Sequence, residues 1–289
     1  GAKFLYEAGN ALLGDEPGVG KTIQTLAVIE ARGLDVQRVL VFVPAVLKVQ
    51  WAEEIKKFLG PVDTVVIEGT PTERVALWES SHKYYIANYE QLLRDVDHMR
   101  MRVWDYIVAD EATKISNPSG KQAKLIKTLK ARYRLALTGT PISNKPEDLW
   151  NVMDFIQPGC LGSYAAFIQR YTFSDASIGL FTYKHMDELG YKVRRYMVRR
   201  LKEQVLTELP PKIITDVPFQ LSDRERILYN QIREEILFEI EHSDISKMND
   251  PITIQNTVVK ILRLRQLVDS LELIGDSKDS TKLEVLQQI

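Results

Sequence analysis

The segment that most constrains the fold is a glycine-rich stretch, GDEPGVGKT, which runs from Gly14 to Thr22. Before it, Asn10 to Leu13 form a short apolar run typical of a strand, and after it apolar residues recur at helical spacing. Glycines let the backbone turn tightly there and bring its N–H groups to the start of the helix, where anions bind. The sequence therefore predicts a strand, a phosphate-binding loop and a helix. The residues expected to hold phosphates are Gly18, Val19, Gly20, Lys21, Thr22 and Ile23.

Two side chains complete the chemistry of this loop. Lys21 would place a mobile positive charge against the β- and γ-phosphates of a nucleotide, and the Thr22 hydroxyl would ligate a magnesium ion that bridges them. The general phosphate-loop pattern has a glycine where this chain has Asp15. A chance match to the pattern is the alternative interpretation of this segment taken alone.

A pair of acids follows a second apolar run. Residues 106–109 have the composition of a buried strand, which would deliver Asp110 and Glu111 at its C-terminal end, where ligands of open parallel sheets bind. Asp110 would hold the magnesium ion, and Glu111 would orient and deprotonate a water. Two solvated acids at a strand end are the alternative. The phosphate loop favours a catalytic role for Lys21, Asp110 and Glu111, because together they are the minimal equipment for splitting a nucleoside triphosphate.

The order and the amino-acid sequences of several segments resemble those of the Swi/Snf-type DNA translocases of helicase superfamily two. The phosphate loop of that family reads DE-x-G-x-GKT, which has an acid at the position of Asp15. The resemblance covers nearly the whole chain. Its further segments are VFVPAVLKVQWAEEI (Val41–Ile55), IANYEQL (Ile86–Leu92), ALTGTPISNKPEDLWNVMDFI (Ala136–Ile156), FIQRYT (Phe167–Thr172) and MVRRLKEQVLTELPPK (Met197–Lys212).

The resemblance implies the ATP-binding motor lobe of a double-stranded-DNA-stimulated ATPase, with ATP and Mg²⁺ as cofactors and double-stranded DNA as a partner. It also implies that Thr138, Gly139 and Thr140 couple the nucleotide state to movement. Thr113 would take part in this coupling, but the family usually has a histidine there, so the replacement puts the coupling in question. The residues that the resemblance and the local charge suggest for DNA binding are Pro44, Lys48, Lys145, Arg199 and Arg200.

The interval from Lys192 to Lys202 carries several basic residues and no acid. Contacts from such residues to phosphates would be independent of base sequence, as a motor that tracks any duplex requires. A solvated helix face and an intramolecular bracing role remain alternatives to DNA contact. Trp51 and Trp150 have helical neighbours that favour packing in the core over stacking on bases.

The pattern of the chain predicts an α/β fold, a RecA-like lobe whose parallel sheet is flanked by helices, followed by a mainly helical protrusion. We expect residues 1–156 to form the ATP-binding lobe, with its N-terminal part incomplete, residues 157–275 to form the protrusion packed on it, and residues 276–289 to begin a second motor lobe. After Cys160 the strand signals nearly vanish. The expected strands are Ala11–Leu13, Val39–Val43, Val62–Ile67, Tyr84–Asn88, Tyr106–Asp110 and Tyr133–Thr138, and the later helices are Tyr164–Tyr171, Met186–Lys202, Arg224–His242 and Ile254–Ile274.

In the family that the chain resembles, a second RecA-like lobe supplies arginine fingers. Only Ser280–Ile289 resembles the opening of that lobe, so we expect this chain alone to be a nearly inactive ATP hydrolase. One alternative is a strand-separating helicase of superfamily two, against which the protrusion-like segments argue. Another is a nucleotide-gated DNA-binding scaffold with weak hydrolysis, which Thr113 leaves open.

Composition restricts the partners. A chain of 289 residues with 45% hydrophobic content can bury a full core, and its net charge of −1 means that any DNA surface must be local. One cysteine cannot form an internal disulfide, and the 4 histidines have no paired ligand spacing for zinc. The longest apolar run, Val39 to Leu47, is too short to span a bilayer. We therefore expect no membrane partner and a cytoplasmic or nuclear location.

Overall fold

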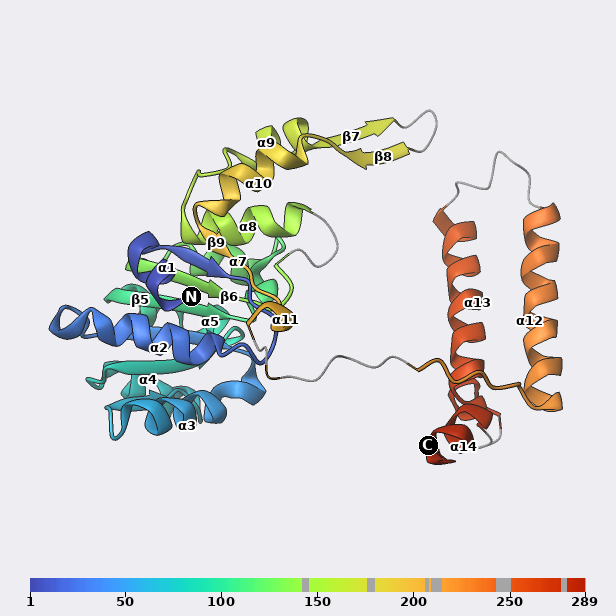
Figure 1. Ribbon diagram of the computed structural model, residues 1–289. Coiled ribbons are helices and arrows are strands. Elements are labelled where there is room, and N and C mark those ends of the chain that lie inside the picture. The colour runs from blue at the N-terminus through green and yellow to red at the C-terminus, as the bar shows by residue number, and fades with distance from the viewer. Residues whose placement is uncertain are drawn as a thin grey trace. The chain divides into compact units, whose positions relative to one another are not determined.

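The computed structural model describes residues 1–141, 146–175, 180–205, 208, 215–242, 251–276 and 280–288. Contacts between Cα atoms divide the chain into two compact units, Gly1–Pro210 and Pro211–Ile289 (Figure 1). The predicted lobe boundary near Ile156 does not coincide with this division. The elements from 157 to 205 belong to the first unit because one of them, β9, pairs with the strand that precedes the phosphate loop.

The first unit is built on a parallel sheet in the order β3-β4-β2-β5-β6-β1-β9. Short apolar runs rich in β-branched and aromatic residues form its central strands, as expected for strands covered on both faces. The predicted parallel sheet is confirmed, and three of the predicted strands have the predicted bounds. The strands are β1 (Ala11–Leu13), β2 (Val39–Val43), β3 (Thr64–Val66), β4 (Tyr84–Asn88), β5 (Val103–Asp110), β6 (Lys130–Leu137) and β9 (Met197–Val198).

Helices cover both faces of this sheet, and alternate strand residues fill two separate cores. On one face, Leu13, Val41 and Val108 pack with side chains of α1, α2 and α3. On the other, Leu12, Phe42 and Ala109 pack with side chains of α4, α7, α8 and α9. The helices are α1 (Ala2–Ala8), α2 (Lys21–Ala31), α3 (Lys48–Leu59), α4 (Pro71–Glu79), α5 (Gln91–Arg94), α6 (Val96–Arg100), α7 (Lys121–Ile126), α8 (Pro146–Ile156), α9 (Tyr164–Tyr171), α10 (Met186–Arg194) and α11 (Lys202–Val205), with 3-10 turns η1 (Gly33–Asp35), η2 (Ala45–Leu47) and η3 (Ala112–Ile115).

The strand register brings the three sequence motifs to one edge of the sheet. Leu137, the last residue of β6, pairs with Leu13 at the end of β1 on one side and with Asp110 at the end of β5 on the other. The phosphate loop, the paired acids and the segment after Leu137 therefore begin at the same level. This is the carboxyl edge, where open α/β sheets bind their ligands.

Two details after Cys160 differ from the sequence prediction. The predicted helix Met186–Lys202 ends at Arg194 as α10, and β9 follows it as the edge strand of the sheet. Strands β7 (Thr172–Asp175) and β8 (Leu180–Tyr183) form an antiparallel pair. Helices dominate this part of the described chain, as predicted, but no sequence signal indicated these short strands. A short strand depends on a partner that local periodicity does not reveal.

The second unit consists of two long helices, α12 (Asp223–His242) and α13 (Pro251–Asp269), followed by η5 (Leu271–Ile274) and α14 (Thr281–Gln288). Figure 1 shows α12 and α13 side by side. The buried carboxylate of Glu225 ties the start of α12 to α14, since it accepts hydrogen bonds from the backbone N–H groups of Ser222 at 2.8 Å and Thr281 at 3.1 Å. Within the described residues, no helix has both the length and the apolar content needed to cross a membrane.

Candidate active site

The phosphate loop, residues 14–20, connects β1 directly to α2. Gly18 and Gly20 have φ angles of 87° and 80°, in the region that glycine adopts without strain. A side chain at Gly20 would also meet Ile23, because a Cβ atom at this position would lie 3.1 Å from the Ile23 Cγ2 atom. The loop therefore needs glycine at these positions. It ends at the N-terminus of an 11-residue helix, whose free N–H groups favour an anion.

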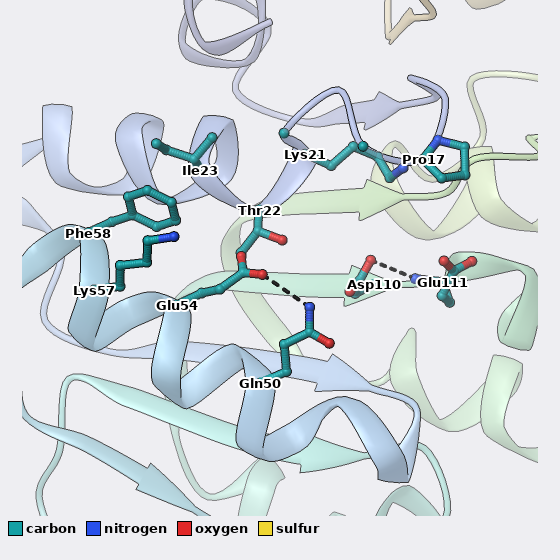
Figure 2. Close-up of a pocket in the computed structure, with 12 residues that line it drawn as sticks. Pro17, Lys21, Thr22, Ile23, Gln50, Glu54, Lys57, Phe58, Asp110 and Glu111 are labelled. Carbon is teal, nitrogen blue, oxygen red and sulfur yellow. Dashed lines mark hydrogen bonds between the residues drawn. The ribbon is translucent and has the colours of Figure 1, made fainter. Parts of the chain in front are cut away.

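One cavity of about 390 Å³ joins the loop to the paired acids. Figure 2 shows Lys21 and Thr22, from the start of α2, on one side of this cavity, and Asp110 and Glu111, from the end of β5, on the other. The Lys21 ammonium donates a hydrogen bond to the Asp15 carbonyl oxygen at 3.0 Å. The remaining lining residues are Pro17, Gly18, Gly20, Ile23, Gln50, Glu54, Lys57 and Phe58.

Two neighbours orient the Asp110 carboxylate, and a third holds its backbone. Its Oδ2 atom accepts a hydrogen bond from the Trp51 indole N–H at 2.8 Å, and its Oδ1 atom accepts one from the Glu111 backbone N–H at 2.9 Å. The Tyr89 hydroxyl donates to the Asp110 carbonyl oxygen at 2.6 Å. Each carboxylate oxygen thus retains lone pairs for a further ligand.

The two acids share a partly dehydrated environment. Burial raises the pKa of Asp110 above its usual range, although the Trp51 N–H, the Glu111 N–H and the Lys21 charge act in the opposite direction. Burial, with the negative charge of Asp110, also raises the pKa of Glu111, against the effect of Lys21. Glu111 has a φ of 48°, an uncommon backbone conformation for a residue other than glycine. A raised pKa makes its carboxylate a stronger proton acceptor.

The segment predicted to couple nucleotide state to movement contacts the phosphate loop. The Thr138 N–H donates to the Leu13 carbonyl oxygen at 3.1 Å, and the Thr138 hydroxyl accepts from the Thr140 N–H at 3.1 Å. A Cβ atom on Gly139 would lie 3.0 Å from Cδ of Pro17. After β5, the strand next to β6, the Thr113 hydroxyl donates to the Glu111 carbonyl oxygen at 3.4 Å. Both segments therefore lie next to residues of the site: Thr138–Thr140 beside the phosphate loop and Thr113 beside Glu111.

The DNA-binding candidates lie at separate places along the carboxyl edge. Pro44 and Lys48 follow β2, and the Lys48 ammonium donates to the Ile67 carbonyl oxygen at 2.8 Å. Arg199 and Arg200 follow β9, and strands β5, β6 and β1 lie between β9 and β2. Arg199 is exposed, whereas Arg200 forms an ion pair with Asp15, as the bracing alternative for this basic run expects. Lys145 lies outside the described residues.

The sequence did not predict the contacts by which three groups orient the site: the Trp51 indole N–H, the Tyr89 hydroxyl and the Arg200 guanidinium. Trp51 and Trp150 are buried, with 3% and 8% exposure, so the prediction that they pack in the core is confirmed. Trp51 also reaches Asp110 across 59 positions of sequence. The helical spacing around Trp51, after β2, indicated that its side chain is buried. Nothing in that spacing indicated a hydrogen bond to Asp110.

The chain is similar to known proteins over most of its length. A family described as the SNF2-related domain matches residues 2–273. The chain is 34% identical over 247 residues to the TATA-binding protein-associated factor BTAF1 of Arabidopsis thaliana. This alignment covers 77% of this chain and 12% of that protein. The chain is 32% identical over 275 residues to the uncharacterized ATP-dependent helicase MG018 of Mycoplasma genitalium, which covers 94% of this chain and 26% of that protein.

Solved structures give the same result for the fold. The SWI2/SNF2 ATPase core of Sulfolobus solfataricus in complex with double-stranded DNA aligns with a TM-score of 0.63 and 28% identity, over 99% of this chain and 61% of that one. The chain thus spans only part of each of these relatives. The family match includes the phosphate loop, the paired acids and residues 138–140, and the chain belongs to the SNF2-related domain family.

Proposed function

We propose that this chain is the ATP-binding motor lobe of a double-stranded-DNA-stimulated ATPase of the Swi/Snf type, which hydrolyses ATP with Mg²⁺ when a second RecA-like lobe closes the site. The observation that carries this proposal is that Lys21, Thr22, Asp110 and Glu111 line one and the same cavity. Membership of the SNF2-related domain family supports it, as do relatives named as an ATP-dependent helicase and as an ATPase core in complex with double-stranded DNA.

The residues present fit a magnesium nucleotide. A hydroxyl at Thr22 and a carboxylate at Asp110 are the hard oxygen ligands that Mg²⁺ prefers, and both line the cavity. Burial raises the pKa of the nearly buried Asp110 carboxylate, and among the described residues no cationic side chain donates a hydrogen bond to it. When bound, Mg²⁺ would neutralise charge on the phosphate oxygens.

Phosphate binding, activation of water and coupling would be carried out by different residues of the chain. The amides at the start of α2 and the Lys21 ammonium would hold the β- and γ-phosphates, and Lys21 would have to leave its hydrogen bond to the Asp15 carbonyl to do so. Glu111 would orient a water and accept its proton, because burial and Asp110 raise its pKa. Thr113 and the segment Thr138–Thr140 would report the state of the site to the rest of the molecule.

Calorimetry with a non-hydrolysable ATP analogue tests the nucleotide site. Replacing Lys21 by alanine should weaken binding about 10- to 100-fold, since a hydrogen bond to a charged group contributes about 1.5–3 kcal/mol. Lys3→Ala is the control, because the Lys3 side chain is 88% exposed on α1 and contacts only Glu7 among the described ion pairs. A Lys21→Ala protein that binds the analogue as tightly as the parent would remove the basis of the assignment.

We propose that DNA contacts the carboxyl edge through Arg199, which follows the edge strand β9, and through Pro44 and Lys48, which follow the internal strand β2. Arg199 is exposed next to a loop that leaves the sheet, and Val46 and Val49 near Lys48 are 86% and 59% exposed. At a strand spacing of about 4.8 Å, the four steps from β2 to β9 separate these groups by roughly 19 Å. A surface of this kind would hold backbone phosphates without reading bases.

A salt titration tests the contact from Arg199. Arg199→Ala should weaken binding to unrelated duplexes equally and lower the slope of log affinity against log salt by about 0.9 for one lost phosphate contact. Fluorescence anisotropy of labelled duplexes measures both quantities. Lys130→Ala is a matched control, since Lys130 is exposed at the amino end of β6, opposite the proposed surface. An unchanged slope in Arg199→Ala would exclude this residue from the DNA surface.

We further propose that the chain from residue 157 to 275 forms the helical protrusion of the family, with residues 276–289 opening a second lobe. The first helix of the proposed protrusion, α9, packs on the ATP-binding lobe. Phe167 and Tyr171 of α9 are buried in the same core as Leu149 and Phe155 of α8. The second unit, with α12 and α13, supplies most of the remaining helical content.

A further inference from the structure

The chain after β9 continues along the phosphate loop. The backbone N–H groups of Leu12, Gly14 and Glu16 donate hydrogen bonds to the carbonyl oxygens of Tyr196, Val198 and Arg200 at 2.7, 2.7 and 3.1 Å. Every second residue on each side takes part. These hydrogen bonds therefore continue the parallel pairing of β1 with β9 beyond the ends of both strands. We call residues 196–202 the brace segment. It holds the first half of the phosphate loop from the side opposite β6.

Asp15, at the position where other phosphate loops carry glycine, is the centre of this contact. Its side chain is fully buried. Its Oδ1 atom accepts hydrogen bonds from the Arg200 backbone N–H at 2.9 Å and from Arg200 Nε at 3.1 Å, and its Oδ2 atom pairs with Arg200 Nη2. A buried carboxylate needs a partner of this kind, because an unpaired charge there would be strongly destabilising.

The same contacts extend to the second half of the loop through Gln24. Its amide N–H group donates to the carbonyl oxygens of Val19 at 3.0 Å and Gly20 at 3.2 Å, and to Asp15 Oδ2 at 3.3 Å. Its amide oxygen accepts from Arg200 Nη2. Arg200 thus holds Asp15 before the glycines and Gln24 after them, while Lys21 hydrogen bonds to the Asp15 carbonyl.

We propose that Arg200 is a positioning residue for the nucleotide: through Asp15 and Gln24 it holds the phosphate loop in the conformation that binds phosphates. The inference rests on the proposed nucleotide function of the loop. Arg200 touches no phosphate in this role, and its effect is exerted on the loop before the nucleotide arrives. Its loss should therefore act on nucleotide affinity and leave the Glu111 chemistry intact.

The test is a double-mutant cycle on the affinity of the chain for the non-hydrolysable ATP analogue. Arg200→Gln and Asp15→Asn should each weaken binding about 10- to 100-fold, because each leaves the other group of the pair without its charge-assisted partner. The double variant should bind more tightly than the product of the two losses predicts, since it buries no unpaired charge. Arg200→Lys keeps the charge and the backbone ladder but lacks the planar fork, and should lie between parent and Arg200→Gln.

Two controls separate positioning from general destabilisation. Trp150 lies on α8, and its indole N–H donates a hydrogen bond to the Gly162 carbonyl oxygen. Trp150→Phe removes this bond and should lower the melting temperature without changing nucleotide affinity. Arg195→Gln removes an exposed arginine just before the brace segment and should change neither quantity. An equal loss of affinity in Trp150→Phe, or strictly multiplicative losses in the cycle, would overturn the positioning role.

The outcome also separates this inference from the proposed function. If Lys21→Ala loses the analogue while Arg200→Gln binds it as the parent does, the nucleotide site stands and Arg200 has no positioning role. If Lys21→Ala binds as the parent does, the nucleotide assignment itself fails. In the two-lobed protein, Arg200→Gln should raise KM for ATP while kcat stays within about a factor of two, whereas loss of a catalytic group would lower kcat.

Discussion

Replacing Glu111 by glutamine is expected to lower DNA-stimulated ATP turnover about 10²- to 10⁴-fold and to leave nucleotide affinity close to that of the parent. Glutamine has the shape of glutamate and would meet the same backbone cost at a φ of 48°, so the local structure should persist. It cannot accept the proton of the attacking water. Steady-state turnover of the protein with both lobes, together with calorimetry on this chain, measures the two quantities.

The control for this prediction lines the same cavity. Glu54, on α3, accepts a hydrogen bond from Gln50 at 3.2 Å, and Glu54→Gln should have a far smaller effect on turnover. Because burial and Asp110 raise the pKa of Glu111, the acid limb of kcat/KM in the parent should lie above the usual range of a glutamate and should vanish in the variant. Parent-like turnover in Glu111→Gln would exclude it as the base, and a parent that binds ATP without turnover would favour the scaffold alternative.

The chain on its own is expected to hydrolyse ATP close to background even with DNA present, and joining a second RecA-like lobe should raise turnover about 10³- to 10⁵-fold. This range is the effect of arginine fingers on phosphoryl transfer. The described lining of the cavity contains Lys21 and Lys57 as its cations and no arginine. A phosphate-release assay on the chain and on the two-lobed protein, each with and without duplex DNA, measures the ratio.

The Lys21→Ala variant of the two-lobed protein is the control for that measurement. It should return turnover to the level of the chain alone, which shows that the added activity belongs to this site and not to a contaminating hydrolase. Strong DNA-stimulated turnover by the chain alone would contradict the need for a second lobe. The chain spans 61% of the solved ATPase core to which it is similar, so a comparison of the two forms is a direct experiment.

Most of the sheet could be predicted because its signals are local. The apolar runs at Ala11–Leu13, Val39–Val43 and Tyr84–Asn88 became strands with the predicted bounds. Gly14 and Pro44, which follow the first two runs, are residues that end a strand. The strand β9 could not be predicted in this way. Met197 and Val198 pair with Leu12 and Leu13 of β1, so their conformation depends on an edge that lies far away in sequence.

By itself the sequence determined the family and the α/β class, and it predicted the set Lys21, Thr22, Asp110 and Glu111, which line one cavity. It could do so because the glycine loop and the acids at a strand end are short motifs whose chemistry is carried by neighbouring residues. The tertiary structure decided what holds these residues in place. The Arg200–Asp15 pair spans 185 positions and the Trp51–Asp110 bond spans 59. No local pattern encodes such contacts, because a buried carboxylate requires a partner but does not specify where in the chain that partner lies.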